Sequence, residues 1–140
     1  MLLQPRKLKY RRNFRPKVGG IAWRGSQLAF GEYGLKILKP GWIKARQLEA
    51  ARKAIVHHTK RQGRLWIRVF PHHPITGKAA GAHMGGGKGD PSYYIANVKA
   101  GALIFELAGL PKDVVYKALR AAANKLPLPT KIVSEKDYEI

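Results

Sequence analysis

The feature that most restricts the fold is a glycine-rich interval between two strand-like runs. Residues 64–70 and 93–98 have strand character, and residues 71–92 between them supply glycine, lysine and histidine with no acid before Asp90. Loops longer than about 12–15 residues are uncommon inside compact domains unless they are functional or disordered. We call residues 71–92 the finger, because each arm of a doubled-back loop of this length could extend up to about 30 Å. Such a finger suits a crowded, phosphate-rich partner.

The charge of the chain is high and unevenly distributed. The sequence has 27 Lys and Arg against 8 Asp and Glu, a formal net charge of +19. Residues 1–89 carry 20 basic and two acidic side chains, whereas residues 90–140 carry seven and six, so the two parts have charges of +18 and +1. A field of one sign adds self-repulsion, which binding to nucleic acid converts into affinity through counterion release. An anionic membrane surface is the rival partner.

The N-terminal residues 1–17, which we call the arm, have no helical or strand periodicity. They interleave two aromatic residues, Tyr10 and Phe14, with seven cations. Aromatic rings can stack on bases, and a tail that only confers solubility does not need them. We therefore predict an extended arm that folds on RNA.

The remaining pattern predicts one α+β domain over residues 1–140, with two helices packed on a mixed or antiparallel sheet. The expected elements are short strands at 28–30 and 33–38, a helix at 44–62 stopped by Gly63, a strand at 64–70, a hairpin of 93–98 and 103–107, a helix at 112–125 and a strand at 130–133. Pro40-Gly41 is expected to break the chain before the first helix.

Both expected helices show apolar residues at spacings of three and four. The inward stripes are Leu48, Ala51, Ile55 and Thr59 with Ala45 and Ala54, and Val115, Leu119, Ala122 and Leu126. The first stripe is largely alanine, whereas helices that lie on membranes carry large apolar side chains, so packing on a sheet is favoured. No apolar run approaches the roughly 20 residues that span a bilayer. We predict no membrane partner.

Catalytic and cofactor motifs fail on their spacing. Lys88 follows Gly87, but Ala82 and Gly89 stand where the phosphate-binding loop needs glycine and a hydroxyl residue. The dinucleotide fingerprint fails because its third glycine would fall at Asp90. Five histidines have no cysteine or carboxylate nearby to complete a metal site, and no serine has a nucleophile's neighbours. We predict no enzyme, no cofactor and no metal.

Three tryptophans could stack on bases, although packing at the core is the usual role. Alternation in residues 64–70 places Trp66 on the same outer face as Arg64 and Arg68, with Leu65, Ile67 and Val69 on the buried face. For Trp66 the pattern leaves RNA contact and a partly exposed packing role both open, whereas Trp23 and Trp42 are expected at the core or its edge.

Five ordered segments resemble the family of bacterial-type large-subunit ribosomal protein sixteen. They are MLLQPRKLKYRR, WIKARQLEAARKA, RLWIRVFPHHPIT, HMGGGKGDPSYYIA and KLPLPTKIV, and the similarity covers essentially the whole chain. The resemblance implies a structural role in the large ribosomal subunit, near the A site and the peptidyl-transferase region. Implied partners are large-subunit rRNA, the elbow of A-site tRNA and neighbouring ribosomal proteins, with no self-oligomer. The alternative is an extra-ribosomal RNA-binding module or assembly factor on the same fold.

The resemblance and the charge pattern together predict the binding residues. The candidates for rRNA are Arg6, Lys7, Lys9, Arg11, Arg12, Arg15, Lys17, Arg24, Arg46, Arg61, Arg64 and Arg68. The resemblance further implies that Arg52 and Lys53 lie near tRNA and that the finger presents Lys78, His83, Met84 and Lys88. The sequence leaves two locations open. One is a ribosome in the bacterial cytoplasm, and the other is a ribosome in an organelle (mitochondrion or plastid) that encodes its own ribosomal proteins.

The chain departs from the family pattern at three positions. His83 stands where the family usually has arginine, so a permanent bidentate cation is replaced by a side chain whose charge depends on pH. His72 replaces the usual aspartate after Phe-Pro. Lys44 replaces a threonine that would cap the first helix, and the sequence offers no evident compensating group.

Overall fold

The computed structural model describes residues 3–7, 19–77 and 90–138. The elements in chain order are β1 (Tyr33–Ile37), β2 (Gly41–Lys44), α1 (Ala45–Thr59), β3 (Arg64–Ile67), β4 (His73–Gly77), β5 (Asp90–Val98), β6 (Leu103–Ala108), α2 (Lys112–Ala123), β7 (Thr130–Ser134) and the 3-10 helix η1 (Glu135–Tyr138). Most of the arm and residues 78–89 of the finger lie outside the described parts of the chain.

Two antiparallel sheets form the β part of the fold. One has the strand order β3-β6-β1-β7, and the other has the order β2-β5-β4. The named strand pairs are antiparallel, and the isolated bridge between Ile21 and Ala100 is parallel. The predicted α+β class with two helices is therefore confirmed, and the sheets are antiparallel rather than mixed.

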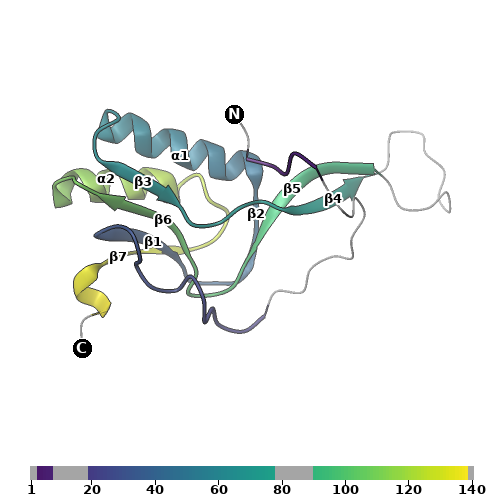
Figure 1. Ribbon diagram of the computed structural model, residues 1–140, viewed down its shortest axis with the longest axis horizontal. Coiled ribbons are helices and arrows are strands. Elements are labelled where there is room, and N and C mark those ends of the chain that lie inside the picture. Colours follow the sequence, from purple (N-terminus) through teal and green to yellow (C-terminus); the bar gives the residue numbers. More distant parts are fainter. Residues whose placement is uncertain (1–2, 8–18, 78–89, 139–140) are drawn as a thin grey trace.

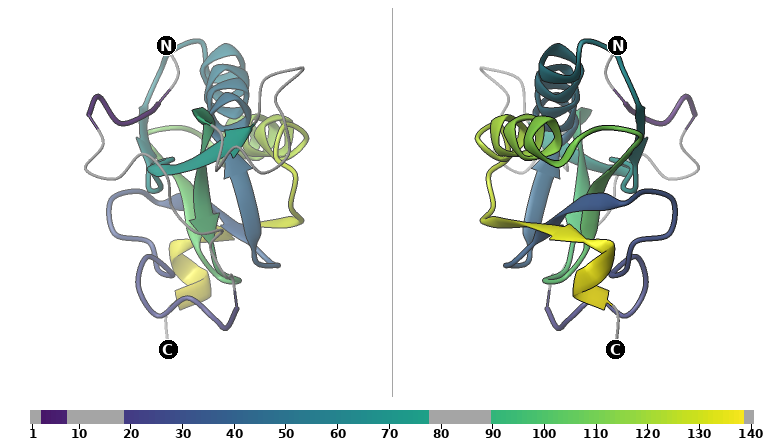
Figure 2. Two further views of the ribbon diagram at one scale, coloured as in Figure 1. Left: turned by 90° about the vertical axis from the view of Figure 1, so that its right-hand side faces the viewer. Right: turned by 90° about the vertical axis from the view of Figure 1, so that its left-hand side faces the viewer.

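The core lies between the two helices and strands of both sheets. Helices α1 and α2 pack against each other (Figure 1), with α1 also against β2 and β5 and α2 against β1 and β7. The end-on views in Figure 2 show both helices on the same side of the four-stranded sheet. Leu48, Ala51 and Ile55 of α1 are at most 1% exposed. Val115 and Leu119 of α2 are fully buried, so both predicted stripes face the core, although Ala54 is only half-buried.

The predicted hairpin of residues 93–98 and 103–107 is wrong, because β5 and β6 belong to different sheets. Strand β5 pairs with β2 and β4, whereas β6 pairs with β1 and β3. The chain turns at 99–102 to pass from one sheet to the other. Strand β2, which the sequence did not predict, exists because its four residues Gly41–Lys44 pair with Ile95–Val98.

The predicted strand at 28–30 is also absent. The backbone N–H groups of Ala29, Phe30 and Gly31 all donate to one carboxylate oxygen of Glu106, at 2.9, 3.0 and 3.0 Å. Three successive donors turned toward one acceptor cannot alternate as a strand requires. Residues 19–31 therefore run over the sheet as an irregular segment held by a side chain.

Helix α1 begins as predicted and ends earlier. Lys44 is the N-cap, and its N–H donates to Oε1 of Gln47 at 2.8 Å, so Gln47 is a compensating group that the sequence analysis overlooked. The helix ends at Thr59 because Lys60 and Arg61 adopt left-handed φ values of 53° and 63°. Gly63 lies just before β3, where the chain passes close to Ala108. A Cβ at this position would lie only 2.6 Å from the carbonyl oxygen of Ala108, so the close approach requires glycine.

The finger contains more strand than the sequence predicted. Strand β4 and the first residues of β5 fall inside 71–92, and they pair antiparallel from His73↔Ile95 to Gly77↔Asp90. Regular pairing is therefore present at both arms of the finger. The β4–β5 hairpin projects from the body at the end opposite to η1 (Figure 1).

Candidate nucleic-acid interface

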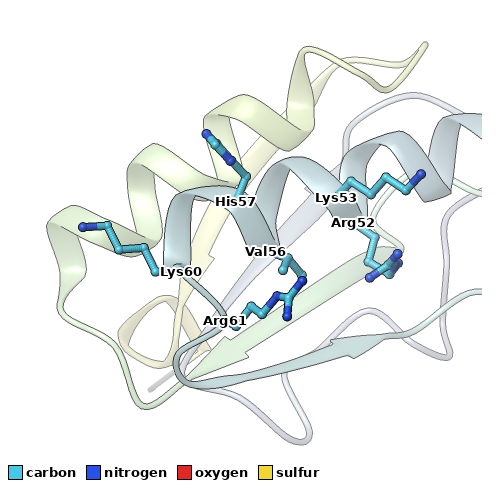
Figure 3. A pocket seen from close by; sticks show the side chains of 6 residues that line it. All are labelled: Arg52, Lys53, Val56, His57, Lys60 and Arg61. Carbon is cyan, nitrogen blue, oxygen red and sulfur yellow. The ribbon is translucent and has the colours of Figure 1, made fainter.

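The outer side of α1 carries a basic groove. Its described lining residues include no acid, and they are Arg52, Lys53, Val56, His57, Lys60 and Arg61. Figure 3 shows Arg52, Val56 and Arg61 along one edge of α1 and its end, and Lys53, His57 and Lys60 along the other. We call this surface the α1 groove. The apolar residues of α1 recur every three or four positions and therefore form one stripe, which faces the core. The cations fall at the positions between them, so they lie on the outer side of the helix.

A buried acid holds one cation of the α1 groove in place. Glu49 is 6% exposed and accepts a hydrogen bond from Nε of Arg52 at 3.1 Å, beside a second contact with Nη2. The hydrogen bonds from Arg52 lower the pKa of Glu49 to about 2 against the effect of burial. Arg52 is therefore oriented by its neighbour, whereas Lys53, Lys60 and Arg61 form no ion pair with any residue that the structure describes.

A second basic surface lies at the base of the β4–β5 hairpin. It is lined by Gln4, Lys44, Ala45, Arg46, Ser92, Tyr93 and Tyr94. Nζ of Lys44 lies 5.0 Å from the ring centroid of Tyr93, and Arg46 is exposed. An exposed ring beside cations can contact both the base and the phosphate of a nucleotide.

Trp66 and Arg64 of β3 and Arg68, which follows the strand, have different surroundings. Trp66 is half-buried and stacks on Phe30, with ring centroids 5.9 Å apart, so of its two possible roles the structure supports packing. Arg68 forms an ion pair with the fully buried Glu106 and lies 5.2 Å from the Phe30 centroid. Its guanidinium therefore holds residues 19–31 to the sheet. Arg64 is exposed.

The other predicted binding residues divide by location. Arg6, Lys7 and Arg24 are exposed. Those outside the described residues are Lys9, Arg11, Arg12, Arg15, Lys17, Lys78, His83, Met84 and Lys88. His72 is exposed, with its Nδ1 3.3 Å from the carbonyl oxygen of Phe70.

Some contributors to these surfaces were missed by sequence reasoning. Lys60 belongs to the α1 groove but was not a candidate, and no role was predicted for Glu49. The spacing of Glu49 and Arg52, three residues apart on a helix, was the available signal. Glu106 had a signal too, because a single acid inside the apolar run LIFELA requires a buried partner.

Within the described residues, no helix is long and apolar enough to cross a bilayer. No group of three or more histidines, cysteines or acids in those parts of the chain could hold a metal ion. The buried acids Glu49 and Glu106 each have an arginine partner.

Known proteins resemble the chain over nearly its full length. A family model described as ribosomal protein L16p/L10e matches residues 5–133. The chain is 50% identical over 139 residues to the large ribosomal subunit protein uL16 of Parabacteroides distasonis, covering 99% of this chain and 96% of that relative. It is 48% identical over 139 residues to the protein of the same name from Porphyromonas gingivalis, with the same coverage.

Proposed function

Because the chain belongs to the ribosomal protein L16p/L10e family, we propose that its basic surfaces bind large-subunit rRNA. Members of this family are structural, non-enzymatic components of the large ribosomal subunit. The proposal also places Arg52 and Lys53 against A-site tRNA. The observation that carries the proposal is the α1 groove, where cations cluster on one helix and no described lining residue is an acid. Such a surface attracts a phosphate backbone.

The positions of the cations in the fold suggest which RNA each of them contacts. Arg52 and Lys53 are adjacent on α1 and both line the α1 groove, so both can contact the backbone of one tRNA. Arg61 and Arg64 flank the turn from α1 to β3 and are both exposed, which suits contact with one stretch of rRNA. Arg46 and the arm residues Arg6 and Lys7 would extend this contact toward the base of the hairpin.

Lys53 offers the cleanest test of the tRNA contact. It is exposed and has no ion-pair partner among the described residues, so its replacement leaves the fold intact. In ribosomes purified with Lys53→Ala or Lys53→Glu, we expect aminoacyl-tRNA to bind the A site about threefold to tenfold more weakly, with the glutamate variant worse. The matched control is Lys117→Ala, an exposed lysine on α2. Equal affinity for wild type and both Lys53 variants would refute the tRNA contact.

The rRNA contact is tested by the salt dependence of binding. The arm contains seven basic residues, so removing residues 1–17 should weaken binding to large-subunit rRNA and flatten the plot of log affinity against log salt by up to about 6. An unchanged slope would rule out an anchoring arm. Family membership does not favour the extra-ribosomal alternative. Retention on translating ribosomes after a high-salt wash distinguishes the two, since an assembly factor would be found on immature particles only.

A further inference from the structure

Trp23 is a large aromatic residue whose side chain is exposed to solvent. It is 91% exposed, the highest value among the large apolar side chains that the structure describes as exposed. The expectation that it packs at the core or its edge is therefore wrong. Exposing an indole to water is unfavourable in the free protein, and tryptophan is a residue that concentrates binding energy when a partner covers it.

The backbone around Trp23 is fixed on both sides. The N–H of Ala22 donates to the carbonyl of Ala100 at 2.8 Å, and the N–H of Leu103 donates to the carbonyl of Gly25 at 2.8 Å. Gly25 has a φ of +66°, a conformation that favours glycine, and it lets the chain turn back. Residues 22–25 therefore form a short loop pinned to the turn between β5 and β6, so Trp23 is presented by an ordered backbone.

The surroundings of Trp23 are basic. A groove beside it is lined by Arg24, Arg68, Asn97 and Lys99 together with small and apolar residues, and the described lining includes no acid. Arg68 is neutralised by Glu106, which leaves the exposed Arg24 and Lys99 as the net charge of the groove. An exposed ring with two cations at its side matches the base and the flanking phosphates of a nucleotide.

We propose that Trp23 is a stacking platform for an unpaired base of large-subunit rRNA, with Arg24 and Lys99 on the adjoining phosphates. This inference rests on the proposed rRNA binding and adds a specific contact to it. An apolar anchor for a neighbouring protein is the rival occupant, but it explains neither the two cations nor the absence of an acid among the described lining residues. Every nucleotide brings a phosphate, so RNA accounts for ring and charge together.

The position of this contact gives it a distinct structural role. Residues 19–31 run along the side of the molecule opposite to α1, and this separation is visible in both Figure 1 and Figure 2. The α1 groove and the Trp23 surface therefore face different neighbours. A base stacked on Trp23 would hold the side of the protein that lies away from the proposed tRNA contact.

The test uses full-length protein rebinding to large-subunit particles from which it has been stripped by a salt wash. We expect Trp23→Ala and Trp23→Leu to weaken rebinding about tenfold, and Trp23→Phe to stay within about threefold, because stacking needs a ring face. The leucine variant is decisive, since it keeps apolar bulk that a protein pocket would accept. Arg24→Ala and Lys99→Ala should each lower the salt slope by about 1.

Ultraviolet crosslinking of the rebound wild-type protein, mapped by mass spectrometry, gives an independent readout. We expect residue 23 to crosslink to a nucleotide of the rRNA. A crosslink to a ribosomal protein, or a Trp23→Leu variant that rebinds like wild type, would overturn the inference. If wild type itself failed to rebind, the proposed rRNA binding would be at fault instead. Thermal unfolding should be unchanged in all Trp23 variants, because so exposed a side chain contributes little packing.

Discussion

At the scale of single residues, Glu106 is the acid on which the fold most depends. It is fully buried in β6, it accepts three backbone hydrogen bonds from residues 29–31, and it pairs with Arg68. Burial by itself would raise the pKa of Glu106, but the hydrogen bonds from Gly31, Arg68, Phe30 and Ala29 lower it below its usual range. The carboxylate is therefore charged, and its negative charge organises the segment that carries Trp23.

Replacing this acid should be costly to stability. In Glu106→Gln the amide can accept fewer hydrogen bonds, and Arg68 keeps a charge that is only 18% exposed. Removing one partner of a buried ion pair costs about 3–5 kcal/mol, and we expect a loss of this size in the free energy of unfolding, measured by urea denaturation. Glu135→Gln, at an exposed acid, is the control. A loss below about 1 kcal/mol would mean that backbone packing alone holds residues 19–31.

Glu49 makes a prediction about pH. Its pKa falls from the usual 4.5 to about 2 in the folded protein, chiefly through the hydrogen bonds from Arg52. A lowered folded-state pKa stabilises the protein above the unfolded pKa, and this contribution is lost as the pH falls toward the folded value. We expect Glu49→Gln to be less stable than wild type by about 1–3 kcal/mol at pH 7.

The measurement is the difference in unfolding free energy between wild type and Glu49→Gln across a pH series. This difference should be constant above pH 4.5 and shrink between pH 4.5 and about 2. Other carboxyl groups titrate in both proteins and cancel. A difference that does not change with pH would show that Glu49 acts through packing rather than through its charge.

At the scale of elements, the sequence predicted what depends on local pattern. Both helices and their buried stripes followed from apolar spacing, and β1 and β7 were found within one residue of their ends. The predictions that failed concern segments whose conformation depends on residues distant in the chain. Strand β2 has four residues after a Pro-Gly break and is defined only by pairing with β5. Residues 28–30 look strand-like, but the N–H groups of Ala29 and Phe30 donate to a carboxylate more than 70 positions away.

The candidate site divides in the same way. The cations of the α1 groove could be placed outward because the apolar stripe fixes the rotation of the helix. The sequence could not show that Arg68 is turned to an internal acid while Arg64 stays exposed, since both fall on the same face of one strand. Nor could the sequence show that Trp23 is exposed whereas Trp66 is half-buried. Trp66 is shielded by Phe30, which belongs to the irregular segment and whose position depends on distant contacts.

The end of α1 makes a prediction at this scale. Arg61 has a φ of 63°, which costs a residue with a Cβ about 1 kcal/mol relative to glycine. We expect Arg61→Gly to raise the free energy of unfolding by up to about this amount and to weaken rRNA binding, lowering its salt slope by about 1. Arg61→Ala is the matched control, because it loses the guanidinium but keeps the Cβ. If both variants unfolded alike, the left-handed backbone would carry no strain worth relieving.

At the scale of the whole molecule, the positive charge is concentrated in residues 1–89, whereas the core draws on both parts of the chain. Residues 90–140 hold a charge of only +1 and contribute β6 and α2 to the core, whereas residues 1–89 hold +18 and contribute β1 and α1. The α1 groove and the Trp23 surface lie on opposite sides of this shared core. We therefore expect the protein to contact the ribosomal RNA on two sides rather than through one face.

This charge distribution gives salt two opposite effects. In the free protein the net charge of +19 is largely uncompensated, and self-repulsion destabilises the compact state. Salt screens that repulsion, with a Debye length of about 10 Å at 0.1 M, so the melting temperature of the isolated protein should rise between 50 and about 300 mM KCl. Over the same range its affinity for large-subunit rRNA should fall, because salt opposes counterion release. Differential scanning calorimetry and filter binding in matched buffers measure the two trends. A melting temperature that fell with salt would mean that attractive pairs such as Arg68–Glu106 outweigh the repulsion, and the excess positive charge would then cost the free protein nothing.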